Sequence, residues 1–359
     1  MEPHGLGEPL HDPQFPQDAK VDIVFIHGLN GDRVKTWTSD ETKKNPSVFW
    51  PKELLPAKCE NARILSFGYN AEVAHFFNIG KAKPPVAPTT TIDDHSAALL
   101  DSLKGLRDRT ETTDRPIMFV CHSLGGLVCA NAIAKQYGAG TAEKDLVDKV
   151  RGMIFLGTPF TGSNHAHWAL IVTQYLRLVV SVNQEKLKHL DERSDTLMNI
   201  SNEFLKSVHE RQRSDAPIEL AFYFEQYPTK RRGLNLGFIV DRESAVPMGF
   251  PALSIPEDHS DMCKFEDEYR SGFISISDNL HQWICALDKG GRDEAMKQGR
   301  VNIHSASVQG VSNVTGVVTA AIVSTATDGN RVVGSQRFTI IGDSTGDIAA
   351  KLAMQAKDD

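Results

Sequence analysis

A serine lies at a junction between two kinds of sequence near the middle of the chain. Ser123 belongs to the run CHSLG at 121–125, which follows the apolar segment 116–121 and precedes a segment rich in small residues. A tight strand-to-helix turn lifts a serine hydroxyl out of a sheet, and small flanking residues let the two backbones approach each other. The pattern therefore predicts a nucleophilic Ser123, although Cys121 stands where this motif usually has glycine. An ordinary turn that contains a serine is the alternative interpretation.

A second motif, HGLNG at 27–31, follows the apolar run 21–26. Attack of a serine on an ester needs backbone N–H groups directed at the developing oxyanion. One comes from the residue after the nucleophile and one from a loop that follows an early strand. We expect Leu124 and Leu29 to supply these two N–H groups. His27, by contrast, is expected to be a packed histidine that orders the loop and not the general base.

The general base of such a site is expected late in the chain, because the order along this kind of fold is serine, acid, histidine. Among 13 histidines, His259 closely follows a short strand-like segment and has this position. For the acid, the sequence leaves three carboxylates open. Glu225 ends an earlier strand-like segment and is preferred, Glu243 is second, and Asp241 is third.

Strand-like and helix-like segments alternate along most of the chain. Apolar runs rich in β-branched residues and closed by turn residues predict strands at 21–26, 62–67, 116–121, 152–156, 218–224, 236–240 and 252–255. Amphipathic spacing and capping residues predict helices at 91–109, up to about 136, and at 272–287. This alternation predicts an α/β fold with a mostly parallel, doubly wound sheet and helices on both faces.

We expect the α/β domain to span residues 21–290, with a helical insertion at 160–213. Within the insertion, residues 164–180 carry apolar side chains at a period of 3.6, together with further apolar residues on a second face. One apolar face of this helix can pack against the domain, while the second apolar face stays uncovered. We therefore expect a lid or a wall of an acyl pocket, and a fully packed helix is the alternative.

Both ends of the chain differ in composition from the predicted domain. Residues 1–20 are rich in Pro, His and acids, and we expect a flexible segment there. Residues 291–359 form a C-terminal tail, in which 301–343 hold many Val, Ser, Thr and Gly, few charges and no proline. The run VTGVVTAAIV at 314–323 has the composition of segments that stack as cross-β between identical chains. The tail is expected to be either disordered or β-structured through homotypic association of residues 301–343.

The overall composition narrows the classes of function. The chain has 359 residues, 40% hydrophobic and 24% charged, as folded globular proteins do. Its net charge of −7 lacks the basic field that attracts nucleic acid, so no nucleic-acid partner is expected. Five cysteines without CxxC spacing predict free thiols in a reducing, intracellular and cytoplasmic setting. The expected chemistry needs no metal and no organic cofactor.

Nine motifs in a fixed order carry a resemblance to a known family. They are VFIHGLNGD, TW, FWPKELLP, ARILSFGYNA, CHSLGGLV, FLGTPFTGS, FYFEQYPT, IVDRESA and DHSDMCKF. Together they resemble the serine esterase or lipase family of α/β-hydrolases, over about residues 21–287. Members of this family are similar to enzymes that remodel glycosylphosphatidylinositol anchors and phosphatidylglycerol, and to the lipase-like domains of fungal nucleotide-binding cell-death proteins.

The resemblance implies a serine esterase or lipase acting on a lipid or acyl ester, with Ser123 as nucleophile and His259 as base. Both Glu225 and Glu243 have counterparts in the family, so the resemblance leaves the acid open. It also allows peripheral membrane contact, and association with mitochondrial or endoplasmic-reticulum membranes. The competing hypothesis is a catalytically silent hydrolase fold that signals through its C-terminal tail, as in fungal cell-death and incompatibility proteins.

Overall fold

A computed structural model describes these residues of the chain: 4–14, 18–42, 45–71, 91–136, 142–161, 170–171, 173–175, 191–214, 216–231, 233–287, 318–320 and 338–340. The chain divides into two compact units, Met1–Leu287 and Asp288–Asp359. Most of the expected lid helix at 164–180 and of the expected self-associating segment at 301–343 lies outside the described residues.

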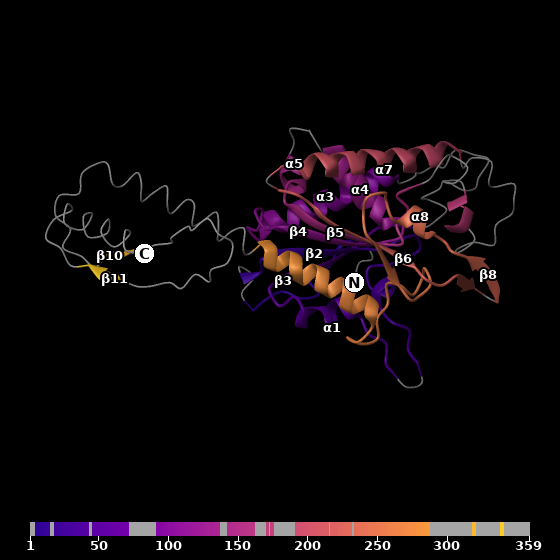
Figure 1. The fold of residues 1–359 in the computed structure, drawn as a ribbon, viewed down its shortest axis with the longest axis horizontal. Coiled ribbons are helices and arrows are strands. Elements are labelled where there is room, and N and C mark those ends of the chain that lie inside the picture. Colours follow the sequence, from indigo (N-terminus) through magenta and orange to yellow (C-terminus); the bar gives the residue numbers. More distant parts are fainter. Residues whose placement is uncertain are drawn as a thin grey trace, which may run out of the picture. The chain divides into compact units, whose positions relative to one another are not determined.

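The first unit is built on a seven-stranded sheet (Figure 1). In spatial order its strands are β1 (Gly5–Leu6), β3 (Ala62–Gly68), β2 (Val21–Ile26), β4 (Ile117–His122), β5 (Val150–Leu156), β6 (Glu219–Glu225) and β9 (Ala252–Ile255). Neighbouring strands from β3 to β9 are parallel, whereas β1 pairs antiparallel with β3. Because β2 lies between β3 and β4, the carboxyl ends of β2 and β4 flank the point where strand order reverses. Sheets of this type bind ligands there.

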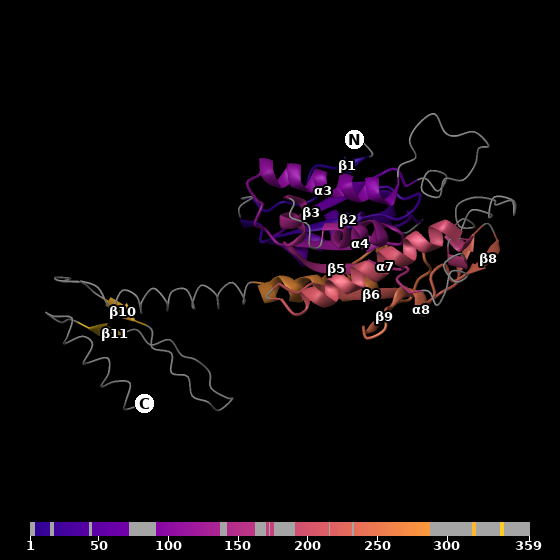
Figure 2. The ribbon, with the colours of Figure 1, turned by 90° about the horizontal axis from the view of Figure 1, so that it is seen from above.

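Helices cover both faces of this sheet (Figures 1 and 2). One face carries α3 (Ile92–Arg109), α4 (Gly125–Gln136), α5 (Ala142–Val147) and α7 (Asp191–Arg211). The other carries α1 (Trp50–Glu53), the 3-10 turns η2 (Lys35–Trp37) and η3 (Leu55–Ala57), and the helical residues 271–287.

Alternating side chains of the central strands belong to two separate hydrophobic cores, one on each face of the sheet. In β2, Val24 and Ile26 join the core beneath α3, α4 and α7, while Ile23 and Phe25 join the core on the opposite face. This is the period of two expected for a strand. Burial on both faces also explains why these strands are continuous apolar runs in the sequence. The predicted mostly parallel, doubly wound sheet is thus confirmed.

The N-terminal segment, expected to be flexible at 1–20, is bound to the sheet where the structure describes it. β1 pairs with β3, and the Leu10 N–H donates to the Ile64 carbonyl at 2.8 Å. The Ile64 N–H in turn donates to the His11 carbonyl at 2.9 Å. Without these bonds β3 would be an open edge strand, and folded proteins cover such edges.

The helical insertion expected at 160–213 does not act as a lid along its whole length. Its last part, α7, packs against α4 and buries Leu197, Phe204 and Val208 in the core. α7 is therefore the crossover helix that two neighbouring parallel strands, β5 and β6, require. Among the described residues of the insertion, those left for a lid are the helical positions 170–171 and 173–175.

The apolar run expected as a strand at 236–240 does not join the main sheet. Instead, β7 (Thr229–Arg231) and β8 (Leu234–Gly237) form a separate antiparallel hairpin. β8 ends at Gly237, whose φ of 76° lies in the left-handed region that glycine adopts readily. The short helix α8 (Arg242–Ala245) follows before the chain returns to the sheet as β9.

A buried ion network lies near the amino end of β2, away from the carboxyl ends of the strands. The Asp22 carboxylate, fully buried in β2, accepts hydrogen bonds from Arg63 at 2.8 and 2.9 Å, from Arg107 at 2.6 Å and from Arg115 at 3.1 Å. These arginines come from β3, α3 and the loop before β4. Buried charges are tolerated when they are paired and hydrogen-bonded, so this network fixes the first strands and α3 relative to one another.

The described part of the second unit is small. β10 (Val318–Ala320) pairs antiparallel with β11 (Phe338–Ile340). Homotypic association through residues 301–343 stays a prediction. Within the described residues of the whole chain, no helix combines the length and apolarity that a membrane span requires.

Candidate active site

Ser123 occupies the sharp turn between β4 and α4. Its φ of 57° is in the left-handed region, which costs a non-glycine residue roughly 1–2 kcal/mol. Three hydrogen bonds hold this turn. The Ser123 N–H donates to the Leu156 carbonyl at 2.8 Å, and the Ser123 carbonyl accepts from the Thr158 hydroxyl at 2.8 Å and from the Gly126 N–H at 3.1 Å. The backbone thus presents the serine in a strained but well-supported conformation.

Two glycines allow the loop after β2 to approach this turn. A Cβ on Gly125 would lie 2.2 Å from the His27 carbonyl oxygen, and a Cβ on Gly28 would lie 2.5 Å from the Ser123 Cβ. Both separations are far below van der Waals contact. The glycines of the HGLNG and CHSLGG motifs therefore let the two loops lie against each other.

Ser123, His259 and Glu225 form a hydrogen-bonded chain across three segments. His259 Nε2 lies 3.2 Å from the Ser123 hydroxyl oxygen, and His259 Nδ1 lies 2.5 Å from Glu225 Oε2. All three residues are at most 3% exposed. Because a carboxylate accepts hydrogen bonds, Nδ1 carries the proton, which leaves Nε2 free to accept one from the serine.

Backbone amides hold the Glu225 carboxylate in place. Glu225 Oε1 accepts from the Ile239 N–H at 2.5 Å and from the Val240 N–H at 3.4 Å. One oxygen is thereby fixed by the backbone, and the other is directed at His259.

Asp241 and Glu243, the two alternative candidates for the acid, have other positions and contacts. Asp241 is the N-cap of α8, where its Oδ1 accepts from the Ser244 N–H at 2.8 Å. Glu243 lies in the first turn of α8, and both side chains are exposed. In the part of the chain that the structure describes, neither hydrogen-bonds to His259.

The two N–H groups expected to bind an oxyanion lie in the loops beside Ser123. Within the described residues, no hydrogen bond is donated by the N–H of Leu29 or of Leu124. His27 holds the start of the Leu29 loop. Its Nε2 accepts a hydrogen bond from the Tyr69 N–H at 3.2 Å, and the rings of His27 and Tyr69 stack with their centroids 4.5 Å apart. Burial lowers the pKa of His27 to about 4, so it is a neutral packing residue as expected.

His122 is a contact of the site that sequence reasoning missed. Its Nε2–H donates to the His259 carbonyl at 2.9 Å, and the two rings lie 5.1 Å apart. Burial, reinforced by repulsion from His259 when that ring is protonated, lowers the pKa of His122 to about 3. A neutral His122 therefore positions the His259 loop. Its place next to Ser123 in the motif was the signal available in the sequence.

Tyr175 is the second contact that was missed. Its hydroxyl donates to the Gly157 carbonyl at 3.3 Å and interacts with the Ser123 hydroxyl, and its ring lies 5.5 Å from that of His259. Burial raises the pKa of this phenol. The side chain comes from the expected lid helix, in which Ile171 is also buried while Leu170 is 54% exposed. This helix therefore places Tyr175 against the serine and the histidine.

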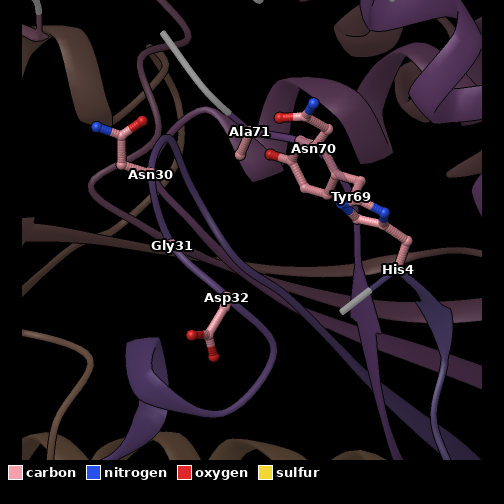
Figure 3. Close-up of a pocket in the computed structure, with 7 residues that line it drawn as sticks. All are labelled: His4, Asn30, Gly31, Asp32, Tyr69, Asn70 and Ala71. Carbon is pink, nitrogen blue, oxygen red and sulfur yellow. The ribbon is translucent and has the colours of Figure 1, made fainter. Parts of the chain in front are cut away.

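A pocket of about 460 Å³ lies next to the Leu29 loop (Figure 3). It is lined by His4, Asn30, Gly31, Asp32, Tyr69, Asn70 and Ala71. Figure 3 shows Asn30 and Asp32, from the loop after β2, across from Tyr69, Asn70 and His4. The pocket thus joins the expected oxyanion loop, the end of β3 and the N-terminal segment. The described residues contain no group of three or more His, Cys, Asp or Glu placed to hold a metal ion.

The low pKa values of the two buried histidines predict a pH dependence of stability. The folded state disfavours protonation of His27 and His122 down to about pH 4 and about pH 3, whereas unfolded histidine titrates near pH 6.5. Between these values the unfolded state binds more protons, so stability falls as pH falls. Each histidine contributes up to about 1.4 kcal/mol per pH unit. Denaturant unfolding from pH 7.5 to 4.5 measures this slope, and His27→Gln should flatten it.

The geometry defines a class of protein. A mostly parallel sheet with helices on both faces, a serine on the turn after β4 and a histidine after β9 are the features of an α/β-hydrolase fold. Residues 92–222 match the family described as "Putative serine esterase (DUF676)", a stretch that contains Ser123 and ends before Glu225. The resemblance to the serine esterase family of α/β-hydrolases is confirmed.

The chain is also similar to curated relatives and to solved structures. The chain is 28% identical over 272 residues to Protein SERAC1 of Bos taurus, covering 71% of this chain and 38% of that protein. It is 27% identical to Protein SERAC1 of Homo sapiens over the same shares. The chain thus spans little more than a third of these relatives. Bacillus licheniformis lipase BlEst2 is 16% identical, with a TM-score of 0.42, over 76% of this chain and 99% of that one.

Proposed function

We propose that the protein is a serine hydrolase that cleaves a carboxylic ester of a lipid or acyl group through an acyl-enzyme. The observation that carries the proposal is the buried hydrogen-bonded chain from Ser123 through His259 to Glu225. A serine, a histidine in the base tautomer and a buried carboxylate in this order form the arrangement that activates a serine for attack.

In the first half of the reaction, His259 Nε2 takes the Ser123 hydroxyl proton while Oγ attacks the ester carbonyl carbon. The carbonyl oxygen becomes an oxyanion, to which the N–H groups of Leu29 and Leu124 donate. His259 then gives its proton to the leaving alkoxide, so the alcohol departs and Ser123 is acylated. Glu225 keeps the histidine oriented and stabilises the transient imidazolium.

In the second half, water replaces the alcohol. His259 takes a proton from this water, the hydroxide attacks the acyl carbon, and the second oxyanion uses the same two N–H groups. Return of the proton to Ser123 releases the acid. The cycle calls on no metal and no organic cofactor.

The surroundings of the serine support a lipid or acyl substrate. Tyr175 brings an aromatic ring to within 5.5 Å of the His259 ring, which suits an acyl chain more than a charged group. Four of the five cysteines are buried thiols and the fifth is half-buried, which supports the intracellular, reducing setting expected from the sequence.

A fluorophosphonate probe tests the proposal on the full chain. We expect the probe to label one serine, Ser123, because attack on its phosphorus requires the same activated hydroxyl. Peptide mapping identifies the labelled residue. Ser207, a buried serine of α7 whose hydroxyl donates to the Phe204 carbonyl at 2.7 Å, provides a matched Ser207→Ala control that labels normally. A folded protein that is not labelled would count against hydrolysis and favour the signalling scaffold.

A further inference from the structure

The β7–β8 hairpin is a feature that the proposed reaction does not use. It is a two-stranded sheet of its own, outside the main seven-stranded sheet (Figure 1). Its strands are three and four residues long, too short to form a core of their own. The position and the surface of this hairpin therefore need a separate explanation.

Both ends of the hairpin are attached to the candidate active site. At its start, the buried Thr229 hydroxyl accepts from the His259 N–H at 3.4 Å. Just past its end, the Ile239 N–H donates to Glu225 Oε1 at 2.5 Å. Because both ends of the hairpin contact the candidate site, a surface that binds the hairpin lies close to the histidine and the carboxylate.

Large apolar side chains on the hairpin and at its two ends are exposed to solvent. Leu234 is 67% exposed, Tyr227 is 53% exposed and Phe238 is 45% exposed. Isolated apolar residues on a surface are ordinary, but several on one small element are characteristic of an interaction site. Tyrosine, which combines an aromatic ring with a polar hydroxyl, suits the level of lipid headgroups.

The charge of the same element is opposite to that of the whole chain. Residues 229–238, TKRRGLNLGF, contain three basic residues and no acid, whereas the chain has a net charge of −7. Lys230 and Arg231 are both exposed. Arg231 pairs with Leu234 across the strands, so a cationic and an apolar side chain lie side by side at the tip.

Exposed cationic and apolar groups on one element match the two layers of an anionic lipid surface. Basic side chains are attracted to anionic headgroups, each by about a factor of five in binding, and apolar side chains enter the acyl boundary beneath them. Lys and Arg place their charge at the headgroups while their aliphatic stems lie deeper. A protein partner would satisfy the apolar part but would not require a cluster of three basic residues.

We propose that the β7–β8 hairpin docks the protein onto an anionic phospholipid surface and so presents that surface to the Ser123 site. Docking itself requires no catalysis, but the delivery of a lipid ester rests on the proposed function. Because Thr229 and Ile239 connect the hairpin to His259 and Glu225, docking places the ester substrate next to the residues expected to cleave it.

Sedimentation of the full chain with vesicles tests the proposal. We expect binding to vesicles of phosphatidylcholine mixed with phosphatidylglycerol, weak binding to phosphatidylcholine alone, and loss of binding as salt is raised. Lys230→Glu with Arg231→Glu should lower the partition by at least about ten-fold. Leu234→Asp with Phe238→Asp should lower it by a similar factor. Ile274→Asp, which alters an apolar residue that is 42% exposed on the helix at 271–287, is the matched control and should bind as the unaltered protein does.

The outcomes separate docking from hydrolysis. Ser123→Ala should keep its vesicle binding, because docking requires no catalysis. Vesicle binding without ester hydrolysis by the native protein would overturn the proposed function and leave docking standing. Equal binding by the native protein and the two hairpin variants would overturn docking and leave hydrolysis standing. Salt-independent binding of the native protein would also overturn it, and this measurement depends on no variant. If the hairpin variants instead change the oligomeric state in sedimentation velocity, the hairpin is a contact between copies of the chain and the proposal fails.

Discussion

Replacing Ser123 with alanine is expected to lower kcat for ester hydrolysis by about a million-fold, to a level supported by the backbone N–H groups and substrate binding alone. The loss is large because the hydroxyl oxygen is the atom that attacks, and among the described residues it is the group hydrogen-bonded to His259 Nε2. Stability should change by less than about 1 kcal/mol, since the serine hydroxyl contacts only the site and alanine fits the same turn.

Hydrolysis of a chromogenic short-chain ester, followed with thermal unfolding on the same samples, measures both expectations. Ser207→Ala is the matched control, because it removes another buried serine hydroxyl far along the chain in α7. Undiminished turnover by a folded Ser123→Ala protein would contradict the proposed mechanism. Equal losses in both variants would point to a general effect on the fold.

The sequence predicted the central strands because they are buried on both faces. β2 was expected at 21–26 and is Val21–Ile26, with all six residues buried. β9 was expected at 252–255 and is Ala252–Ile255, although three of its four residues are only partly buried. α3 begins one residue after Thr91, whose side chain forms a capping box with Asp94, so its start was also evident. Continuous apolar runs and capping residues are local signals, and local signals can be read without tertiary structure.

Features that depend on distant partners could not be predicted in the same way. β1 is two residues long and becomes a strand because β3 offers an open edge. The contact between His122 and the His259 carbonyl joins residues 137 positions apart. Tyr175 was assigned to an amphipathic helix, but periodicity does not reveal which of its faces meets Ser123. Each of these roles arises from tertiary packing that overrides or supplements the local pattern.

The acid illustrates the same limit within the candidate site. Glu225, Asp241 and Glu243 lie within 19 residues of one another in the sequence, and all follow strand-like segments. What separates them is the course of the chain after β8. Gly237 ends that strand, and the backbone then turns so that the Ile239 and Val240 N–H groups meet Glu225. Asp241 is consequently directed to the start of α8.

Glu225→Gln is expected to lower kcat by about 10³- to 10⁴-fold while Km changes little. The glutamine carbonyl can keep the hydrogen bonds from the Ile239 and Val240 N–H groups, which directs its NH₂ at His259 Nδ1. Nδ1 must then accept, so the proton moves to Nε2 and the histidine can no longer take one from Ser123. The variant also lacks the negative charge that stabilises the imidazolium.

Two matched variants decide which carboxylate completes the site. Glu243→Gln alters an exposed side chain of the same type, and Asp241→Asn keeps an N-cap, because asparagine caps helices as well as aspartate does. Both should keep kcat within about two-fold of the unaltered protein, as surface substitutions usually have small effects. Since all three changes remove one carboxylate from a stretch of 19 residues, net charge cannot explain a difference among them. A sharp loss of kcat in Asp241→Asn or Glu243→Gln, with normal turnover in Glu225→Gln, would show that the acid assignment is wrong.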